Sequence, residues 1–517
     1  MSAPVLRRLR RLYHSIRTPQ SGSTALMFGL SFLPLMLALG VAVDFGNHVR
    51  AYSNLQAAAD AAALAAARSD GTLSAKTLVA QNYFDANLGK FATGYGASMG
   101  LVDSTGKVTV TASMTVPNYI MKLVTTSSDT IRVTSEVTKQ ANGLEVVLVF
   151  DNTGSMAQNS RLTTLKQAAR DFTGILFGDR TTSTTLKLGI VPFSGGVNVG
   201  PANQNKFWID KNGVTSISTK NFNLAGWHNW RAWTSLTNRT WNGCVESRSG
   251  TYAFDDTAPN AGQPETLFTP YFAPDEPGNA GSSVTLKDAN KVNNTYYNSW
   301  RNDSTTGSDM DARQRSPAKY TNASVSSTSQ GPDQNCQIAP ITPLIGTKKT
   351  ILDAIDAMVP NGSTVIPEGL AWGLRVLSPT EPFTEGTIFN NNKIRKALIL
   401  LTDGENDVGS NGSALPNHNK SWYSAAGYIA QNRLGTTNFT TFHTTLDAKT
   451  AQVCDRIKNS GVIVYSFAYS VTNTNAKNMI KTCASSPEKY FDPPSNAALV
   501  ASFNQIAAEL RNLYLSK

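Results

Sequence analysis

The sequence predicts an α/β protein with a mostly parallel sheet, held behind a membrane-spanning helix. Unbroken apolar segments at 144–150, 186–193, 396–401 and 462–469 alternate with helical stretches, as in parallel sheets covered by helices on both faces. An uncharged apolar run at 23–43 precedes them. At 517 residues with 40% hydrophobic content, the chain is long enough for two or more domains with buried cores.

The run at 23–43 is long enough to cross the hydrocarbon layer of a membrane, about 30 Å, as a helix. Asp44 follows it, and residues 1–22 form a basic segment with five arginines, namely Arg7, Arg8, Arg10, Arg11 and Arg17. This asymmetry predicts a cytoplasmic N-terminus and an exported remainder. A cleaved signal peptide is the alternative, but its apolar core usually has about 7–15 residues, so we expect a retained anchor.

The net charge of +10 does not indicate a nucleic-acid-binding protein. About half of it comes from the arginines before residue 23, and the rest is spread along the chain without a basic run.

Residues 44–142 predict a small module of helices and strands. Residues 52–68 are rich in alanine, the residue with the highest helix propensity, and a second helical pattern follows at 72–88. Alternating segments at 107–114 and 130–137 predict strands. We place the end of this module at Asn142, where the pattern changes.

Residues 143–517 then form the α/β domain, interrupted at about 200–345 by a segment rich in Asn, Ser, Thr and Gly. Six of the eight tryptophans lie in this segment, which predicts an ordered insertion with its own aromatic core. A recognition surface is the alternative use of these aromatic residues.

The four cysteines suit an exported domain, because cysteines pair in oxidising compartments. None forms a Cys-x-x-Cys motif. Three pairings are open. We favour Cys244 with Cys336 and Cys454 with Cys483, since each pair stays within one region, and four buried free thiols are the alternative.

Three loops with oxygen-bearing side chains follow the predicted elements. They hold Asp151, Thr153 and Ser155 after the first strand, Thr364 after a helical stretch, and Asp403 after the strand at 396–401. Ligands of open α/β sheets lie at the carboxyl ends of the strands, so these loops are expected to converge. Two carboxylates and three hydroxyls suit a hard cation such as Mg²⁺.

This pattern resembles the metal-ion-dependent adhesion site of von Willebrand factor type A domains, which is Asp-x-Ser-x-Ser with a distant Thr and a distant Asp. Thr153 replaces a serine and keeps the hydroxyl. The resemblance implies a type A domain in which the five residues bind Mg²⁺, Mn²⁺ or Ca²⁺ and the ion accepts an acidic side chain of a partner protein. Simple turn residues are the alternative.

An enzymatic interpretation competes with this one. Asp-Asn-Thr-Gly-Ser at 151–155 and Asp-Gly-Glu-Asn-Asp at 403–407 also resemble the phosphorylated-aspartate and metal-binding motifs of P-type ATPases. Asn152 stands where those enzymes have lysine, and only one membrane span is predicted. We therefore predict a protein that is not an enzyme.

The N-terminal part resembles TadG-like proteins of the bacterial tight-adherence (Flp) pilus machinery. The match runs from Gly22 to Ala67 and includes the apolar segment and LQAAADAAALAAA; WNGCVE at 241–246 and CASSPEKYF at 483–491 also look like this family. Met27 stands at the fifth position after Gly22, where prepilins have glutamate, which again favours a retained anchor.

The resemblances together imply a single-pass protein of the bacterial inner membrane with a periplasmic C-terminal domain, and a partner that is a pilin, another pilus-assembly protein or a surface protein. A structural subunit stabilised by its ion, and the phosphoaspartate enzyme, are the alternatives. The sequence leaves the oligomeric state open.

Overall fold

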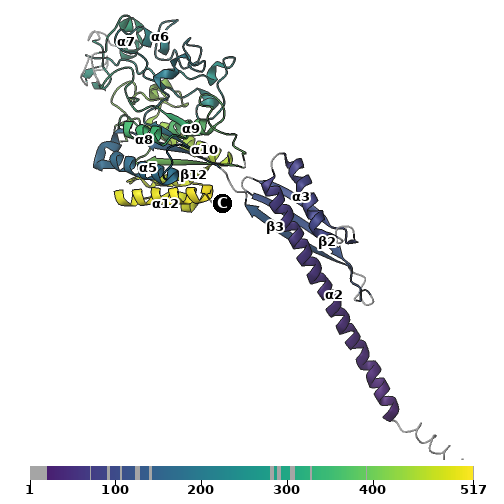
Figure 1. The fold of residues 1–517 in the computed structure, drawn as a ribbon. Coiled ribbons are helices and arrows are strands. Elements are labelled where there is room, and N and C mark those ends of the chain that lie inside the picture. The colour runs from purple at the N-terminus through teal and green to yellow at the C-terminus, as the bar shows by residue number, and fades with distance from the viewer. Residues whose placement is uncertain are drawn as a thin grey trace, which may run out of the picture. The chain divides into compact units, whose positions relative to one another are not determined.

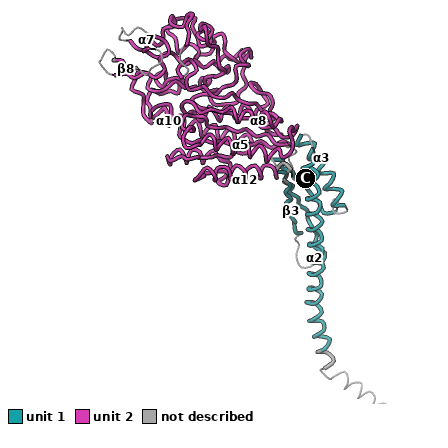
Figure 2. Tube along the Cα trace, turned by 60° about the vertical axis from the view of Figure 1, so that its left-hand side comes forward, with its two compact units in different colours: residues 1–139 teal, residues 140–517 magenta. Residues whose placement is uncertain are grey.

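The chain divides into two compact units, residues 1–139 and 140–517 (Figure 2). The basic segment before residue 20 and the boundary predicted at Asn142 lie outside the described residues. The computed structural model describes residues 20–69, 72–89, 94–104, 107–120, 122, 128–138, 143–279, 284–287, 293–302, 309–325, 329–391, 393–410 and 412–515.

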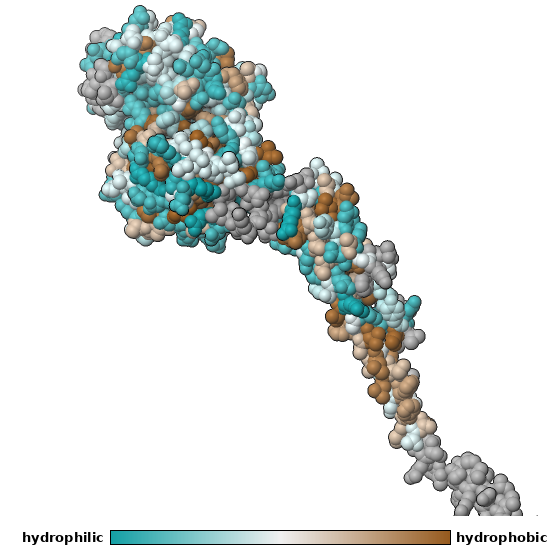
Figure 3. All heavy atoms as spheres, viewed as in Figure 1, coloured by the Kyte–Doolittle hydropathy of each residue, from teal (hydrophilic) through white to brown (hydrophobic). Residues whose placement is uncertain are grey.

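The first unit is built on one long helix, α2 (Gln20–Arg68), whose 49 residues span roughly 70 Å. In its first half, apolar side chains such as Leu26 and Phe28 are 66% and 70% exposed. Figure 3 shows apolar side chains along this part of the helix. By length and composition, α2 can cross a membrane, in agreement with the predicted anchor.

The second half of α2 is the alanine-rich segment, and it is buried instead. Ala58, Ala59 and Ala62 are fully buried in a core that α2 shares with a second helix and with a sheet whose central strand alternates between buried and more exposed residues. Small side chains allow this close approach of helix and sheet. The unit contains α3 (Leu73–Leu88) and an antiparallel sheet with the order β1 (Ser98–Ser104), β2 (Lys107–Val116), β3 (Asp129–Thr138) (Figure 1).

Asp44 lies on α2 directly after the predicted membrane span. Its side chain is buried, and its two carboxylate oxygens each accept a hydrogen bond at 3.0 Å, from the backbone N–H groups of Tyr119 and Ile120. Because each oxygen has a donor, the buried charge is compensated. The helix and the chain after β2 are therefore tied together at this point.

The second unit is an eight-stranded mixed sheet with a parallel centre. The strand order is β13-β12-β11-β4-β5-β6-β7, with β10 beside β5. The strands from β13 to β5 are parallel, whereas β6, β7 and β10 are antiparallel. The bounds are β4 (Gly143–Asp151), β5 (Leu186–Phe193), β6 (Val197–Asn198), β7 (Cys244–Val245), β10 (Thr342–Ile345), β11 (Ile394–Thr402), β12 (Ile463–Ala468) and β13 (Tyr490–Phe491).

Helices cover both faces of this sheet, as predicted (Figure 1). In β4 the side chains alternate: Val146 and Leu148 pack in one core, Val147 and Val149 in the other. On the first face lie α5 (Arg161–Phe177), α8 (Lys348–Ala357) and α12 (Asn496–Leu515); on the second lie α9 (Ile366–Leu377), α10 (Phe439–Asn459) and α11 (Thr474–Cys483). The α/β prediction is confirmed.

The tryptophan-rich segment at 200–345 does not have a core separate from the sheet. Its aromatic rings pack on one another in tilted and edge-to-face pairs, but they continue into the core beside α9, where the Phe268 and Trp372 ring centroids are 4.7 Å apart. The expectation of a local core must be corrected in this respect. The segment contains α6 (Asn229–Thr234), α7 (Met310–Arg315) and the hairpin of β8 (Val284–Lys287) and β9 (Asn293–Tyr296).

Short 3₁₀ helices complete the described elements of the second unit. Their bounds are η2 (Gly154–Ser160), η3 (Pro201–Asn205), η4 (Gly250–Tyr252), η5 (Pro264–Thr266), η6 (Pro317–Tyr320), η7 (Ile429–Gln431) and η8 (Pro487–Lys489).

Two disulfides join the cysteines in the favoured pairs. Cys244 is bonded to Cys336 with a Cα–Cα distance of 6.2 Å, and Cys454 is bonded to Cys483 with a Cα–Cα distance of 4.9 Å. The first disulfide joins two parts of the 200–345 segment, and the second joins α10 to the end of α11.

Replacing Ala59 by leucine is expected to lower the free energy of unfolding of the first unit by about 1–3 kcal/mol, because its side chain is fully buried in the core of this unit. Ala57→Leu is the matched control, since Ala57 is exposed on the same helix. Hydrogen exchange of β2 in the detergent-solubilised protein measures the effect. Equal protection in both variants would contradict this packing.

Candidate cation site

The site begins where two neighbouring parallel strands end. Strands β4 and β11 pair in register, with Phe150 beside Leu401, so Asp151 at the end of β4 lies next to Thr402 at the end of β11. The Thr402 hydroxyl donates a hydrogen bond of 2.7 Å to Oδ2 of Asp151. The pairing therefore brings together two loops that are about 250 residues apart in the chain.

The hydroxyls of the first loop connect it to the third. The backbone N–H of Thr153 donates to Oδ1 of Asp151 at 2.8 Å. The Thr153 and Ser155 hydroxyl oxygens are 2.9 Å apart, and the Ser155 hydroxyl donates to Oδ1 of Asp403 at 2.7 Å. Two hydroxyls and two carboxylates thus lie in one continuous cluster.

The second loop, residues 361–364, is fixed to both of the others through its main chain. Asn361 N–H donates to the Asn152 carbonyl at 2.7 Å, and Gly154 N–H donates to the Gly362 carbonyl at 3.0 Å. Thr364 exchanges two backbone hydrogen bonds, of 2.8 and 3.0 Å, with Asp407. The buried Thr364 is therefore held at the same edge of the sheet as the cluster.

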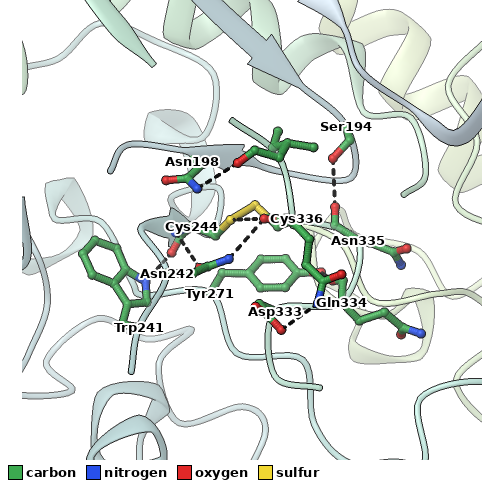
Figure 4. Close-up of a disulfide and its surroundings, with 12 residues drawn as sticks. Ser194, Asn198, Trp241, Asn242, Cys244, Tyr271, Asp333, Gln334, Asn335 and Cys336 are labelled. Atoms are coloured by element: carbon green, nitrogen blue, oxygen red, sulfur yellow. Dashed lines mark hydrogen bonds between the residues drawn. A yellow bond between two sulfur atoms is a disulfide. The ribbon is translucent and has the colours of Figure 1, made fainter. Parts of the chain in front are cut away.

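The segment before Cys336 supports this second loop, and Figure 4 shows the contact of this segment with Ser194. The Ser194 hydroxyl, just past β5, donates to the Asn335 carbonyl at 2.9 Å. Gly362 has φ of +86°, and a Cβ on it would lie only 2.8 Å from the same carbonyl oxygen. The Cys244–Cys336 disulfide holds the segment at the next residue, so the loop conformation depends on a glycine and on a cross-linked neighbour.

Burial dominates the electrostatics of the site. Asp151 is completely buried, and Thr153 and Asp403 are 1% and 6% exposed. Burial and, second to it, the nearby negative charge of Asp403 together raise the pKa of Asp151 to about 7, against hydrogen bonds that lower it. A carboxyl with this pKa binds a proton near neutral pH unless another cation takes its place.

Arg161, the first residue of α5, is the positive group of the site. Its Nη1 donates to Oδ2 of Asp403 at 2.7 Å, and its side chain is 15% exposed. Both oxygens of Asp403 are thus engaged, one by Ser155 and one by Arg161.

The donor set fits a hard cation. It consists of oxygen atoms only, which Mg²⁺, Mn²⁺ and Ca²⁺ prefer. Three further buried oxygens of the same loops lack a hydrogen-bond partner within the described chain: Oδ1 of Asn152, Oδ1 of Asn361 and Oγ of Ser363. With only two carboxylates, the site is not a cluster of three or more His, Cys, Asp or Glu side chains, and the described residues contain no such metal cluster.

The five residues singled out from the sequence thus lie on three loops that contact one another. Asp151, Thr153, Ser155 and Asp403 are linked through their side chains, and Thr364 joins through its main chain. Sequence reasoning missed Arg161 and Thr402. Thr402 had a usable signal, because it ends an apolar strand next to Asp403; Arg161 had none beyond its place at a helix start.

Residues 22–69 match the family model described as Tad, "Putative Flp pilus-assembly TadE/G-like". This segment of the chain is similar to that family. It coincides with α2 from the apolar half to the end of the alanine-rich half. The resemblance noted between Gly22 and Ala67 is thereby confirmed. Comparison with curated proteins finds no match.

Several solved structures are similar to the chain at low identity. The pilus adhesin SpaC from Lactobacillus rhamnosus GG is 12% identical, with a TM-score of 0.31, covering 81% of this chain and 34% of its own. The vWF domain of the type V pili tip protein Mfa5 from Porphyromonas gingivalis is 10% identical, with a TM-score of 0.33, covering 72% and 95%. This chain thus spans about a third of the length of SpaC.

A third similar structure is proximal thread matrix protein 1 from the mussel byssus, with a zinc-occupied MIDAS motif. It is 13% identical, with a TM-score of 0.28, and the match covers 72% of this chain and 48% of that one.

Without added cation, the stability of the second unit should depend on pH through Asp151. Because its pKa is raised in the folded protein, the proton stabilises the fold fully below the ordinary pKa near 4, and this contribution is lost as the pH rises through about 7. Asp151→Asn mimics the protonated form. In urea unfolding with EDTA, the free energy of unfolding of the variant should rise relative to that of the wild type between pH 4 and pH 8. A difference that stays constant over this range would contradict the raised pKa of Asp151.

Gly362→Ala should destabilise the second unit, because the new methyl group meets the Asn335 main chain and φ is positive. Gly435→Ala is the matched control, with φ of +79° and no heavy atom within 4 Å of the added Cβ. The free energy of unfolding should fall by at least about 1 kcal/mol more for Gly362→Ala. Equal losses would mean that the contact with Asn335 is unimportant.

Proposed function

We propose that this protein is a single-pass component of the Tad pilus or secretion apparatus in the bacterial inner membrane, with its N-terminus in the cytoplasm and its second unit in the periplasm. Its part is to hold a partner protein through a divalent cation. The partner is a pilin, another pilus-assembly protein or a surface protein that offers an acidic side chain. The anchor, in this proposal, is not cleaved.

The observation that carries the proposal is the convergence of three loops at the carboxyl edge of the parallel sheet. Their hydrogen bonds fix oxygen donors before any ion arrives, so little ordering remains to be done on binding. The TadE/G-like segment at 22–69 supports the pilus-related setting.

In this proposal, some residues of the site bind the cation and others orient the ligands. The hydroxyls of Thr153, Ser155 and Thr364 and the carboxylates of Asp151 and Asp403 would hold the cation. Thr402 and the Thr153 N–H orient Asp151, since each occupies one of its oxygens. A bound Mg²⁺ supplies a position for a carboxylate oxygen of the partner.

A stabilising ion without a partner is the second candidate, and the burial of Asp151 favours it. In that case, chelation lowers the melting temperature but leaves protein contacts intact. The phosphoaspartate enzyme is disfavoured by the same burial, because a nucleophile must reach its substrate and both oxygens of Asp151 are engaged.

Thr364→Val should weaken Mg²⁺ binding at least about tenfold, since it removes one hydroxyl while the backbone bonds to Asp407 keep the loop in place. Thr173→Val on α5 is the control, because its buried hydroxyl donates only to the Ala169 carbonyl within the helix. Isothermal titration calorimetry measures the affinity, and Asp151→Ala should abolish it. Unchanged Mg²⁺ affinity in Asp151→Ala would reject the site.

Partner binding is tested by co-purification from membranes of the native organism with Mg²⁺ or with EDTA. We expect a partner that is lost in EDTA and in Asp151→Ala. Retention of every partner under both conditions, with a lower melting temperature in EDTA, would favour the stabilising ion instead.

A further inference from the structure

Arg161 competes for the same carboxylate that a cation needs. Its guanidinium is 2.7 Å from Oδ2 of Asp403, whose side chain is only 1% exposed. Nε of Arg161 is also buried and has no hydrogen-bond partner among the described residues. A buried Nε–H group without a hydrogen-bond partner is costly, so packing alone does not explain the position of Arg161.

The net charge of the cation-loaded site depends on whether Arg161 is present. When both carboxylates are ionised, as they are with a bound cation, they and the guanidinium together carry one net negative charge. A divalent cation brings this to one net positive charge, whereas the same site without the arginine would become neutral. In a buried environment of reduced dielectric, one unit of charge strongly changes the attraction for a carboxylate.

We propose that Arg161 is a positioning residue that weakens cation binding and strengthens the capture of an acidic ligand by the loaded site. This inference rests on the proposed function. The guanidinium repels the cation and shares Asp403 with it, so the affinity for the ion alone is reduced. Once the ion is present, the surplus positive charge favours a carboxylate from outside. Cation and acidic ligand therefore bind cooperatively.

The test uses the detergent-solubilised full-length protein, Mn²⁺ as the cation and acetate as the carboxylate probe. Electron paramagnetic resonance of free Mn²⁺ gives the Mn²⁺ affinity, and the water-proton relaxation of the bound ion, titrated with acetate, gives the carboxylate affinity. For Arg161→Gln we expect Mn²⁺ to bind at least about tenfold more tightly and acetate to bind at least about threefold more weakly. A merely structural role would not move the two affinities in opposite directions.

Arg170→Gln is the matched control. Arg170 lies nine residues further along α5, roughly 14 Å away by helix rise, and pairs with Asp356 at an exposed position. The substitution Arg170→Gln removes the same charge from the same helix, but at a distance where salt screens its effect on the cation site. Both affinities should stay within about twofold of the wild type.

Arg161→Lys keeps the charge and covers the case in which Arg161→Gln does not fold. Its Mn²⁺ affinity should stay within about threefold of the wild type. The inference is overturned if folded Arg161→Gln binds Mn²⁺ as tightly as the wild type or more weakly. It is also overturned if Arg161→Lys, which keeps the charge, binds Mn²⁺ at least about tenfold more tightly than the wild type, as expected for Arg161→Gln. If the wild type binds Mn²⁺ no better than Asp151→Ala, the proposed cation site itself fails, which is a separate result.

Discussion

The candidate site depends on the parallel pairing of β4 with β11. This register places Asp151 against Thr402 at the common end of the two strands, and Asp403 follows one residue later. A shift of the strand register by one residue would move Val147 and Val149 from one core to the other. The packing of both cores is incompatible with such a shift. Hydrophobic packing on two faces therefore fixes the position of the carboxylates, and hydrogen bonds between the loops only refine it.

The added segments support the site from the outside. The 200–345 segment continues the core on the α9 side, and the chain at 333–336 returns from it to contact Ser194 and Gly362. The Cys244–Cys336 disulfide restrains this return in the unfolded chain as well as in the folded one. The insertion thus supports the 361–364 loop. Its buried aromatic residues contribute to the core and do not form a recognition surface.

Much of the architecture was predictable because burial leaves a periodic trace in the sequence. The strand predicted at 186–193 has the bounds of β5, and the unbroken apolar runs identified the parallel centre. Strands β6 and β7 were missed, since two residues carry no periodicity. Loop residues of the site were predicted from their type and from where they follow strands. Arg161 was missed because its contact with Asp403 joins residues 242 positions apart.

The two halves of α2 differ in how their apolar side chains are covered. Both are helical and apolar, yet large side chains such as Leu26 stay exposed in the first half, whereas alanines such as Ala59 are buried in the second. The difference follows from what packs beside the helix: α3 and the sheet cover the second half, where alanine side chains allow a close approach, whereas the large apolar side chains of the first half suit contact with lipid. Asp44 lies between the halves with its charge satisfied by two backbone N–H groups. A charge satisfied in this way can follow an apolar segment without interrupting the helix, so the packed part of the first unit begins directly after the segment that is long and apolar enough to cross a membrane.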